Sequence, residues 1–185
     1  MRVSMLRSVV SPVAVLLLTA CGATTSSTDG GQQTGGKRIF ITKTTFLGNL
    51  GGLAGADAKC TAAAAARSLG GTWKAWLSDA STNAIDRIGD VGPWVLVGSG
   101  TRVFDNKAQL ATGPNGPINR DETGAVFDGP AWTGTQAGGN TSNQTCNGWT
   151  LASGPAGTYG HTEHRWTDEG TTSCANPSAL YCIEQ

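Results

Sequence analysis

Four cysteines beyond residue 59 constrain the fold more than any other feature of the chain: Cys60, Cys146, Cys174 and Cys182. None of them forms a Cys-x₂-Cys pair, so their spacing does not match the usual zinc ligand sets. In an exported protein an even number of cysteines predicts disulfides, here with three possible connectivities. We predict the nested arrangement, Cys60–Cys182 and Cys146–Cys174. Loops of about 120 and about 30 residues closed in this way would stabilise the fold by about 5 and about 3.5 kcal/mol.

The N-terminal sequence predicts export. Arg2 and Arg7 precede an apolar run, residues 13–18, that is too short to span a bilayer as a helix. The run ends in Leu18-Thr19-Ala20-Cys21, which resembles the lipobox of bacterial lipoproteins. The resemblance implies a signal peptide over residues 1–20 and acyl chains on Cys21, which hold the mature protein at the membrane of the cell envelope. The alternative is an ordinary secretory signal with a cysteine near its cleavage site.

Residues 21–36 are expected to form a flexible tether behind the lipidated cysteine. The segment is rich in Gly, Ser, Thr and Gln and has no large apolar side chain, so it cannot bury enough surface to fold. Gly22 after the lipidated residue implies, by the same resemblance, sorting to the outer membrane or cell surface. Without residues 1–20 the basic residues fall from 13 to 11 (Arg2 and Arg7 are lost) against 13 acids, a net charge near −2. This balance argues against a nucleic-acid partner.

The remaining residues, 37–185, make up one domain. β-branched and aromatic residues predict a first strand over 37–42, and an alanine-rich stretch predicts a helix over 53–69. We expect the last strand, 180–183, to lie beside the first. Further short strands are expected at 73–77, 94–97, 101–104, 126–127 and around Trp132, with long loops elsewhere between 105 and 175. The Trp-Thr dipeptides at Trp132, Trp149 and Trp166 are interpreted as core positions under these loops.

Six strings in order carry a resemblance to a known fold family: residues 48–60 (GNLGGLAGADAKC), 74–79 (KAWLSD), 117–119 (PIN), 132–135 (WTGT), 146–150 (CNGWT) and 180–185 (LYCIEQ). They resemble a bacterial lipoprotein domain of uncharacterised function with the C-type-lectin-like fold, in its endostatin-like branch. The resemblance implies an α+β domain over residues 37–185, with one main helix near its start, short and mostly antiparallel strands, long loops and nested disulfides. Some members of that family bind extracellular-matrix or serum proteins.

Calcium-dependent sugar binding is not expected from the sequence. Sugar-binding C-type lectins carry Glu-Pro-Asn or Gln-Pro-Asp, whereas this chain has Gly113-Pro114-Asn115. Oxygen ligands for calcium could come from Asp105, Asn119, Asp121, Glu122 and Asp128, but their spacing fits no calcium loop, and acids among Gly, Asn and Pro commonly form turns. His161 and His164 are too close together for the zinc motifs and are interpreted as part of a solvated loop. We therefore expect no cofactor.

The sequence favours a non-enzymatic, surface-anchored binding module that takes a protein or glycan ligand on its long loops. The residues expected near the ligand are Asn119, Asp121, Glu122, Trp149, His161 and Trp166. One alternative is a hydrolase of envelope polymers that uses the paired carboxylates of Glu122 and Asp128. Another is a structural envelope protein without a dedicated ligand.

Overall fold

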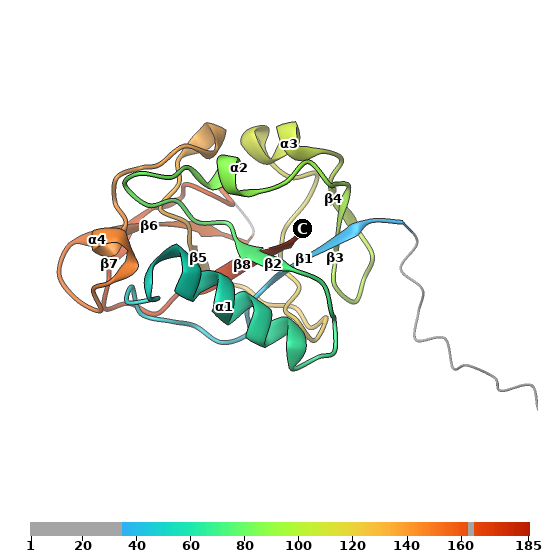
Figure 1. Cartoon of the computed structure of the whole chain (residues 1–185), viewed down its shortest axis with the longest axis horizontal. Helices are drawn as coiled ribbons and strands as arrows, with labels where there is room; N and C mark the ends of the chain where they lie inside the picture. The colour runs from blue at the N-terminus through green and yellow to red at the C-terminus, as the bar shows by residue number, and fades with distance from the viewer. Residues whose placement is uncertain (1–34, 163–164) are drawn as a thin grey trace, which may run out of the picture. The chain divides into compact units, whose positions relative to one another are not determined.

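The computed structural model describes residues 35–162 and 165–185 (Figure 1). The predicted signal peptide, Cys21 and nearly all of the tether lie outside these residues. The described part is a mixed α+β structure whose elements are β1 (Lys37–Ile41), α1 (Gly52–Ala65), β2 (Trp73–Ala75), α2 (Ala84–Arg87), β3 (Trp94–Leu96), β4 (Arg102–Phe104), α3 (Lys107–Thr112), β5 (Pro130–Trp132), the 3₁₀ turn η1 (Ala137–Gly139), α4 (Cys146–Trp149), β6 (Ala156–His161), β7 (Gly170–Ser173) and β8 (Ala179–Glu184). None of its helices is long and apolar enough to cross a membrane.

The last strand, β8, is the centre of the sheet. Within the described residues the strand order is β4-β3-β1-β8-β5-β6-β7, and β2 pairs with β8 as well. β8 runs antiparallel to β1, with Ile39 opposite Ile183, so the prediction that the first and last strands are neighbours is confirmed. β5 and β2 pair with successive stretches of β8, at residues 179–180 and 182–184.

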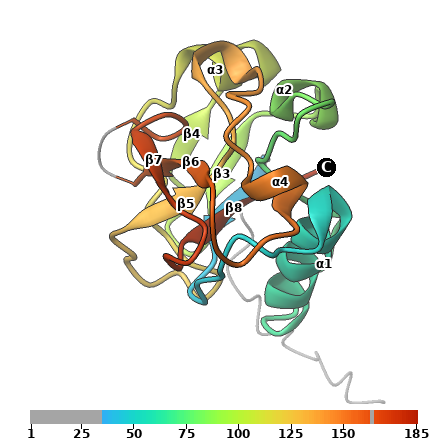
Figure 2. The same cartoon turned by 90° about the vertical axis from the view of Figure 1, so that its left-hand side faces the viewer.

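Both faces of this sheet are buried. Side chains alternate between the two faces of a strand, and in β8 Tyr181 and Ile183 belong to one hydrophobic cluster while Leu180 and Cys182 belong to another. The second cluster also contains the small residues of α1. The first contains Leu110 of α3. In Figures 1 and 2 the strands β1 and β8 accordingly lie between α1 and the pair α2 and α3.

The two disulfides have the predicted nested connectivity. Cys60–Cys182 joins α1 to β8, with a Cα–Cα distance of 5.4 Å. Cys146–Cys174 joins α4 to the segment after β7, with a Cα–Cα distance of 5.7 Å. The first bridge fixes the main helix on the sheet, and the second fixes the loop-rich half of the domain.

A buried arginine connects α1, β2 and α2. Nη2 of Arg87 donates to both carboxylate oxygens of Asp57, at 2.6 and 2.7 Å. Nη1 of the same side chain donates to the carbonyl oxygens of Ala75 and Leu77, at 2.8 and 2.9 Å. A guanidinium group suits this place because its planar fork of donors can meet a carboxylate and two carbonyls at once.

A second ion pair joins β1 to the end of β8. Arg38 donates from Nε and Nη2 to the two carboxylate oxygens of Glu184, both at 2.7 Å, and its backbone N–H donates to Oε2 at 2.9 Å. Burial of Glu184 opposes its ionisation, but the hydrogen bonds and charge of Arg38 outweigh that effect and lower the pKa of the carboxyl. The pKa of Arg38 is raised by the same hydrogen bonds.

Three predictions about the chain between 53 and 175 need correction. The main helix ends at Ala65 rather than residue 69, because the chain turns through Ser68, which has a φ of 53°. Residues 126–127 form no strand, since Val126 is exposed and makes only an isolated bridge to Arg120. Conversely, β6 and β7 lie in the stretch that was expected to be loop.

Candidate functional site

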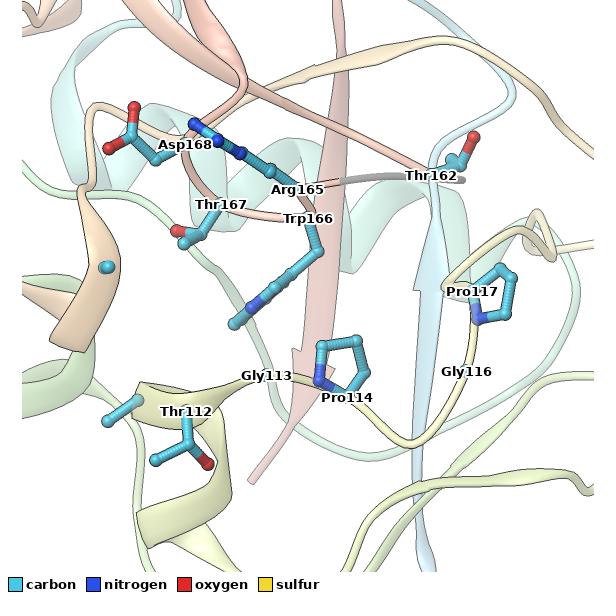
Figure 3. A pocket seen from close by; sticks show the side chains of 12 residues that line it. Thr112, Gly113, Pro114, Gly116, Pro117, Thr162, Arg165, Trp166, Thr167 and Asp168 are labelled. Atoms are coloured by element: carbon cyan, nitrogen blue, oxygen red, sulfur yellow. The ribbon is translucent and has the colours of Figure 1, made fainter.

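A pocket of about 520 Å³ opens between α3, η1 and the chain that follows β6. It is lined by residues 111–114, Gly116, Pro117, Ala137, Thr162 and residues 165–168, and is called the larger pocket below. Figure 3 shows the Trp166 ring pointing toward the Thr112–Gly113 end of α3, with Pro117 and Thr162 at the opposite end. Its volume falls within the range of about 300–1,000 Å³ that is common for ligand sites.

Trp166 gives the larger pocket a rigid apolar surface. Its ring lies against Trp76 at a centroid distance of 4.7 Å and against Phe104 at 5.1 Å, and the residue is only 5% exposed. Nε1 of Trp76 donates to Oγ1 of the neighbouring Thr167 at 2.8 Å. The tryptophan therefore offers one edge to the pocket while the rest of the ring belongs to the core.

The segment that carries Trp166 is fixed by backbone contacts. The N–H of His161 donates to the carbonyl of Arg165 at 3.0 Å, and Oγ1 of Thr133 donates to the carbonyl of Thr167 at 2.6 Å. Gly160 is required here, because a Cβ at this position would overlap the carbonyl oxygen of Trp166. The close approach of two backbone segments thus sets the position of this side of the pocket.

The opposite side is formed by the chain that leaves α3. Gly113 ends the helix with a φ of 123°, a conformation that favours glycine. The N–H of Asn115 then donates to the carbonyl of Val103 at 2.8 Å, and Nε2 of Gln109 donates to Oδ1 of Asn115 at 2.6 Å. Ile118 is fully buried beyond the turn. These contacts hold the two prolines of the turn, Pro114 and Pro117, at the pocket.

Two charged side chains of opposite sign also line the larger pocket, Arg165 and Asp168 (Figure 3). Arg165 is exposed and Asp168 is partly exposed. Among the described residues neither side chain forms an ion pair. Both can therefore interact with a ligand that covers the apolar surface between α3 and Trp166.

Of the six residues predicted to lie near a ligand, Trp166 alone lines the larger pocket. Trp149 is fully buried, and its Nε1 donates to the carbonyl of Ser78 at 2.7 Å. It belongs to α4, where all four residues from Cys146 to Trp149 have positive φ values of 49–65°, a left-handed turn. The interpretation of Trp132, Trp149 and Trp166 as core positions is confirmed, since they are 0%, 0% and 5% exposed.

Asn119, Asp121 and Glu122 lie together in a turn away from the larger pocket. Oδ1 of Asp121 accepts hydrogen bonds from the N–H groups of Thr123 and Ala125, at 2.8 and 3.0 Å, and the residue is 3% exposed. Oε2 of Glu122 accepts from the N–H of Lys43 at 2.9 Å. Both carboxylates are bonded within the fold: that of Asp121 forms a local turn, as expected of an acidic residue among polar neighbours, and that of Glu122 contacts a segment distant in sequence.

His161 lies at the end of β6 and lines a smaller pocket of about 290 Å³. Its Nε2 is 3.8 Å from Oδ1 of Asp128, which also accepts a hydrogen bond from Thr162 at 3.1 Å. His164 lies outside the described residues. Within residues 35–162 and 165–185, no group of three or more His, Cys, Asp or Glu side chains is arranged to hold a metal ion.

Most residues of the larger pocket were not predicted from the sequence. Residues 111–114, Gly116, Pro117, Arg165 and Asp168 line it but were not predicted to contact a ligand. The Gly-Pro-Asn-Gly-Pro run of residues 113–117 was a usable signal, since it follows a short helix and contains no residue that could extend it. No sequence pattern marks Arg165 and Asp168 as ligand contacts, because it is the turn after β6 that brings them to the pocket.

Among curated proteins, none matches the chain. A family match covers residues 43–167, which is more than half of the chain and includes α1, both walls of the larger pocket except Asp168, and Cys146. The family carries the description "Protein of unknown function (DUF1554)". The chain therefore belongs to the DUF1554 family.

Proposed function

We propose that this protein is a non-enzymatic binding module, held at the outside of the cell envelope by acyl chains on Cys21. The larger pocket is its binding site, and the ligand is a segment of an extracellular protein or glycan. The observation that carries this proposal is the construction of the pocket: a fixed Trp166 edge, two prolines and the charged groups of Arg165 and Asp168 line one cavity. Pockets of this kind, mostly apolar with a few polar groups, are typical of binding sites.

The C-type-lectin-like fold, in its endostatin-like branch, is part of the same proposal. It is supported by the pairing of the first and last strands, by a single long helix that is disulfide-bonded to the last strand, and by a loop-rich half closed by a second disulfide. In such a scaffold the loops are free to meet a ligand. Fold alone does not define the ligand, so the binding site is argued from its residues.

The test is a binding screen of the purified mature protein against a glycan array and against immobilised extracellular-matrix and serum proteins, with and without a chelator. We expect saturable binding that persists in the chelator. Arg165→Ala is expected to lower the affinity about tenfold, as for a contact at an interface hot spot. Arg102→Ala is the matched control, because Arg102 is exposed and lies outside the pocket, and it should change the affinity less than twofold. No binding to any surface, or equal effects of the two variants, would contradict the proposal.

The membrane anchor is tested separately by mass spectrometry of the protein isolated from its native membrane. We expect an N-terminal Cys21 that carries acyl chains, and we expect Cys21→Ser to release the protein from the membrane fraction. A mature protein that begins at another residue and is recovered in soluble form would contradict the lipoprotein assignment.

A further inference from the structure

We propose that the smaller pocket, between β5, β6, β7 and the chain before β8, binds one neutral sugar ring. It is separate from the larger pocket and goes beyond the function proposed for that site. Its volume of about 290 Å³ lies at the lower end of the range for small-molecule sites, which suits a ligand of about the size of a monosaccharide. Its lining consists of Pro130, Tyr159, His161, Thr172, Asn176, Pro177 and Ser178.

The first argument is the hydroxyl of Ser178. The residue is 1% exposed, and within the described part of the chain its Oγ has no hydrogen-bond partner. Its backbone is fixed, because its N–H and its carbonyl both bond to the backbone of Phe46, at 3.0 and 2.8 Å. A buried hydroxyl without a partner destabilises a protein, whereas a ligand hydroxyl placed beside it would supply both a donor and an acceptor.

The second argument is that other polar groups line the pocket together with Ser178. Nδ2 of Asn176 donates to Oγ1 of Thr172 at 2.7 Å, and the N–H of Asn176 donates to the carbonyl of Ser173 at 2.9 Å. The amide is therefore held in place, with its Oδ1 available as an acceptor. Amides and hydroxyls both donate and accept, which matches the hydroxyls of a sugar better than it matches an ion.

The third argument is the absence of permanent charge in the lining. Neither a lysine, an arginine nor a carboxylate is among the lining residues, so the described pocket offers no counter-charge to an ionic ligand. His161 adds an imidazole ring, whose Nε2 lies 3.8 Å from Oδ1 of Asp128. Tyr159 and the two prolines add apolar surface against which the C–H face of a sugar ring can pack. A neutral polyol with an apolar face satisfies each of these features.

The experiment is ligand-observed NMR on the purified mature protein with glucose, galactose, mannose and N-acetylglucosamine, followed by titration of the sugar that gives a signal. Affinities of about 1 mM are expected for a single ring. Ser178→Ala and Asn176→Ala should each weaken that sugar about fivefold or more, a difference of about 1 kcal/mol in binding. Ser178→Ala should do so without lowering the melting temperature, because it removes a hydroxyl that has no partner.

Arg165→Ala is the control, since it alters the larger pocket and should leave sugar affinity within twofold. No signal with any of the four sugars would overturn the proposal, and so would a signal that Ser178→Ala and Asn176→Ala leave unchanged. The result also separates the two proposals. Sugar binding that depends on Ser178 stands even when no macromolecule is captured, and capture that depends on Arg165 stands even when no sugar binds.

Discussion

Removal of the Arg87 guanidinium should cost about 3 kcal/mol of unfolding free energy. In Arg87→Met the four hydrogen bonds to Asp57, Ala75 and Leu77 are lost. The Arg87 side chain is 8% exposed and that of Asp57 is 27% exposed. Removal of one partner of a buried ion pair lowers the free energy of unfolding by about 3–5 kcal/mol. The partial exposure of Asp57 places the expected loss at the lower end of that range.

Urea unfolding with both disulfides intact measures this loss. At a slope of about 2 kcal/mol per molar, 3 kcal/mol lowers the midpoint by about 1.5 M. The matched control is Arg102→Met, because Arg102 and Asp105 form an ion pair of 3.4 Å in which both side chains are more than half exposed. That variant should lose less than about 0.5 kcal/mol. If the two variants lose equal amounts, the stabilising role assigned to the buried arginine is refuted.

Glu184→Gln should be less stable than the wild type above about pH 4.5, the ordinary pKa of the carboxyl. Because the pKa of Glu184 is lowered in the folded state, the stability difference between the two proteins should shrink as the pH falls through that folded-state pKa. Thermal melts over a series of pH values measure this difference. Gly160→Ala should lose about 3 kcal/mol or fail to fold, since a Cβ there overlaps backbone; urea unfolding and secretion yield report this. Ser78→Ala should lose about 1–3 kcal/mol, because it breaks hydrogen bonds to Thr135 and Ala84, whereas Ser178→Ala should lose nothing measurable in the same assay.

The parts of the fold that could be predicted are those specified by local sequence. The first strand and the alanine-rich helix have strong intrinsic preferences, and both form within a few residues of the expected bounds. The residues of the helix that are buried are small, namely Ala56, Cys60 and Ala64. Here local preference and tertiary contacts agree, so the sequence alone was sufficient.

β6 could not be predicted, because only Thr158 and Tyr159 of its six residues favour strands and a glycine stands on each side of that pair. Its sequence is AGTYGH, and glycine in a strand indicates a place where another group approaches closely. Gly157 lies under the ring of Trp132, where a Cβ would be 2.7 Å from a ring carbon, and Gly160 faces the backbone of residue 166. The strand forms because of contacts distant in sequence, which composition cannot show.

The larger pocket depends on the same long-range contacts. Trp166 could be predicted as a buried aromatic, but its position in the larger pocket depends on the close approach of its backbone to Gly160. Asp121 and its neighbours, which were predicted to lie near a ligand, do not line the larger pocket, and the reason lies in their local hydrogen bonds. An acidic side chain that forms its own turn has its oxygens already bonded, and the sequence does not distinguish that use from ligand binding.

The arrangement at the end of β6 connects the two pockets. His161, the last residue of β6, lines the smaller pocket, and Thr162, the first residue of the turn that follows, lines the larger one. Oδ1 of Asp128 lies 3.8 Å from His161 and 3.1 Å from Thr162, so one carboxylate oxygen contacts a lining residue of each pocket. Asp128 itself lines neither pocket. A substitution of Asp128 would therefore remove one contact from a lining residue of each pocket without removing a lining group.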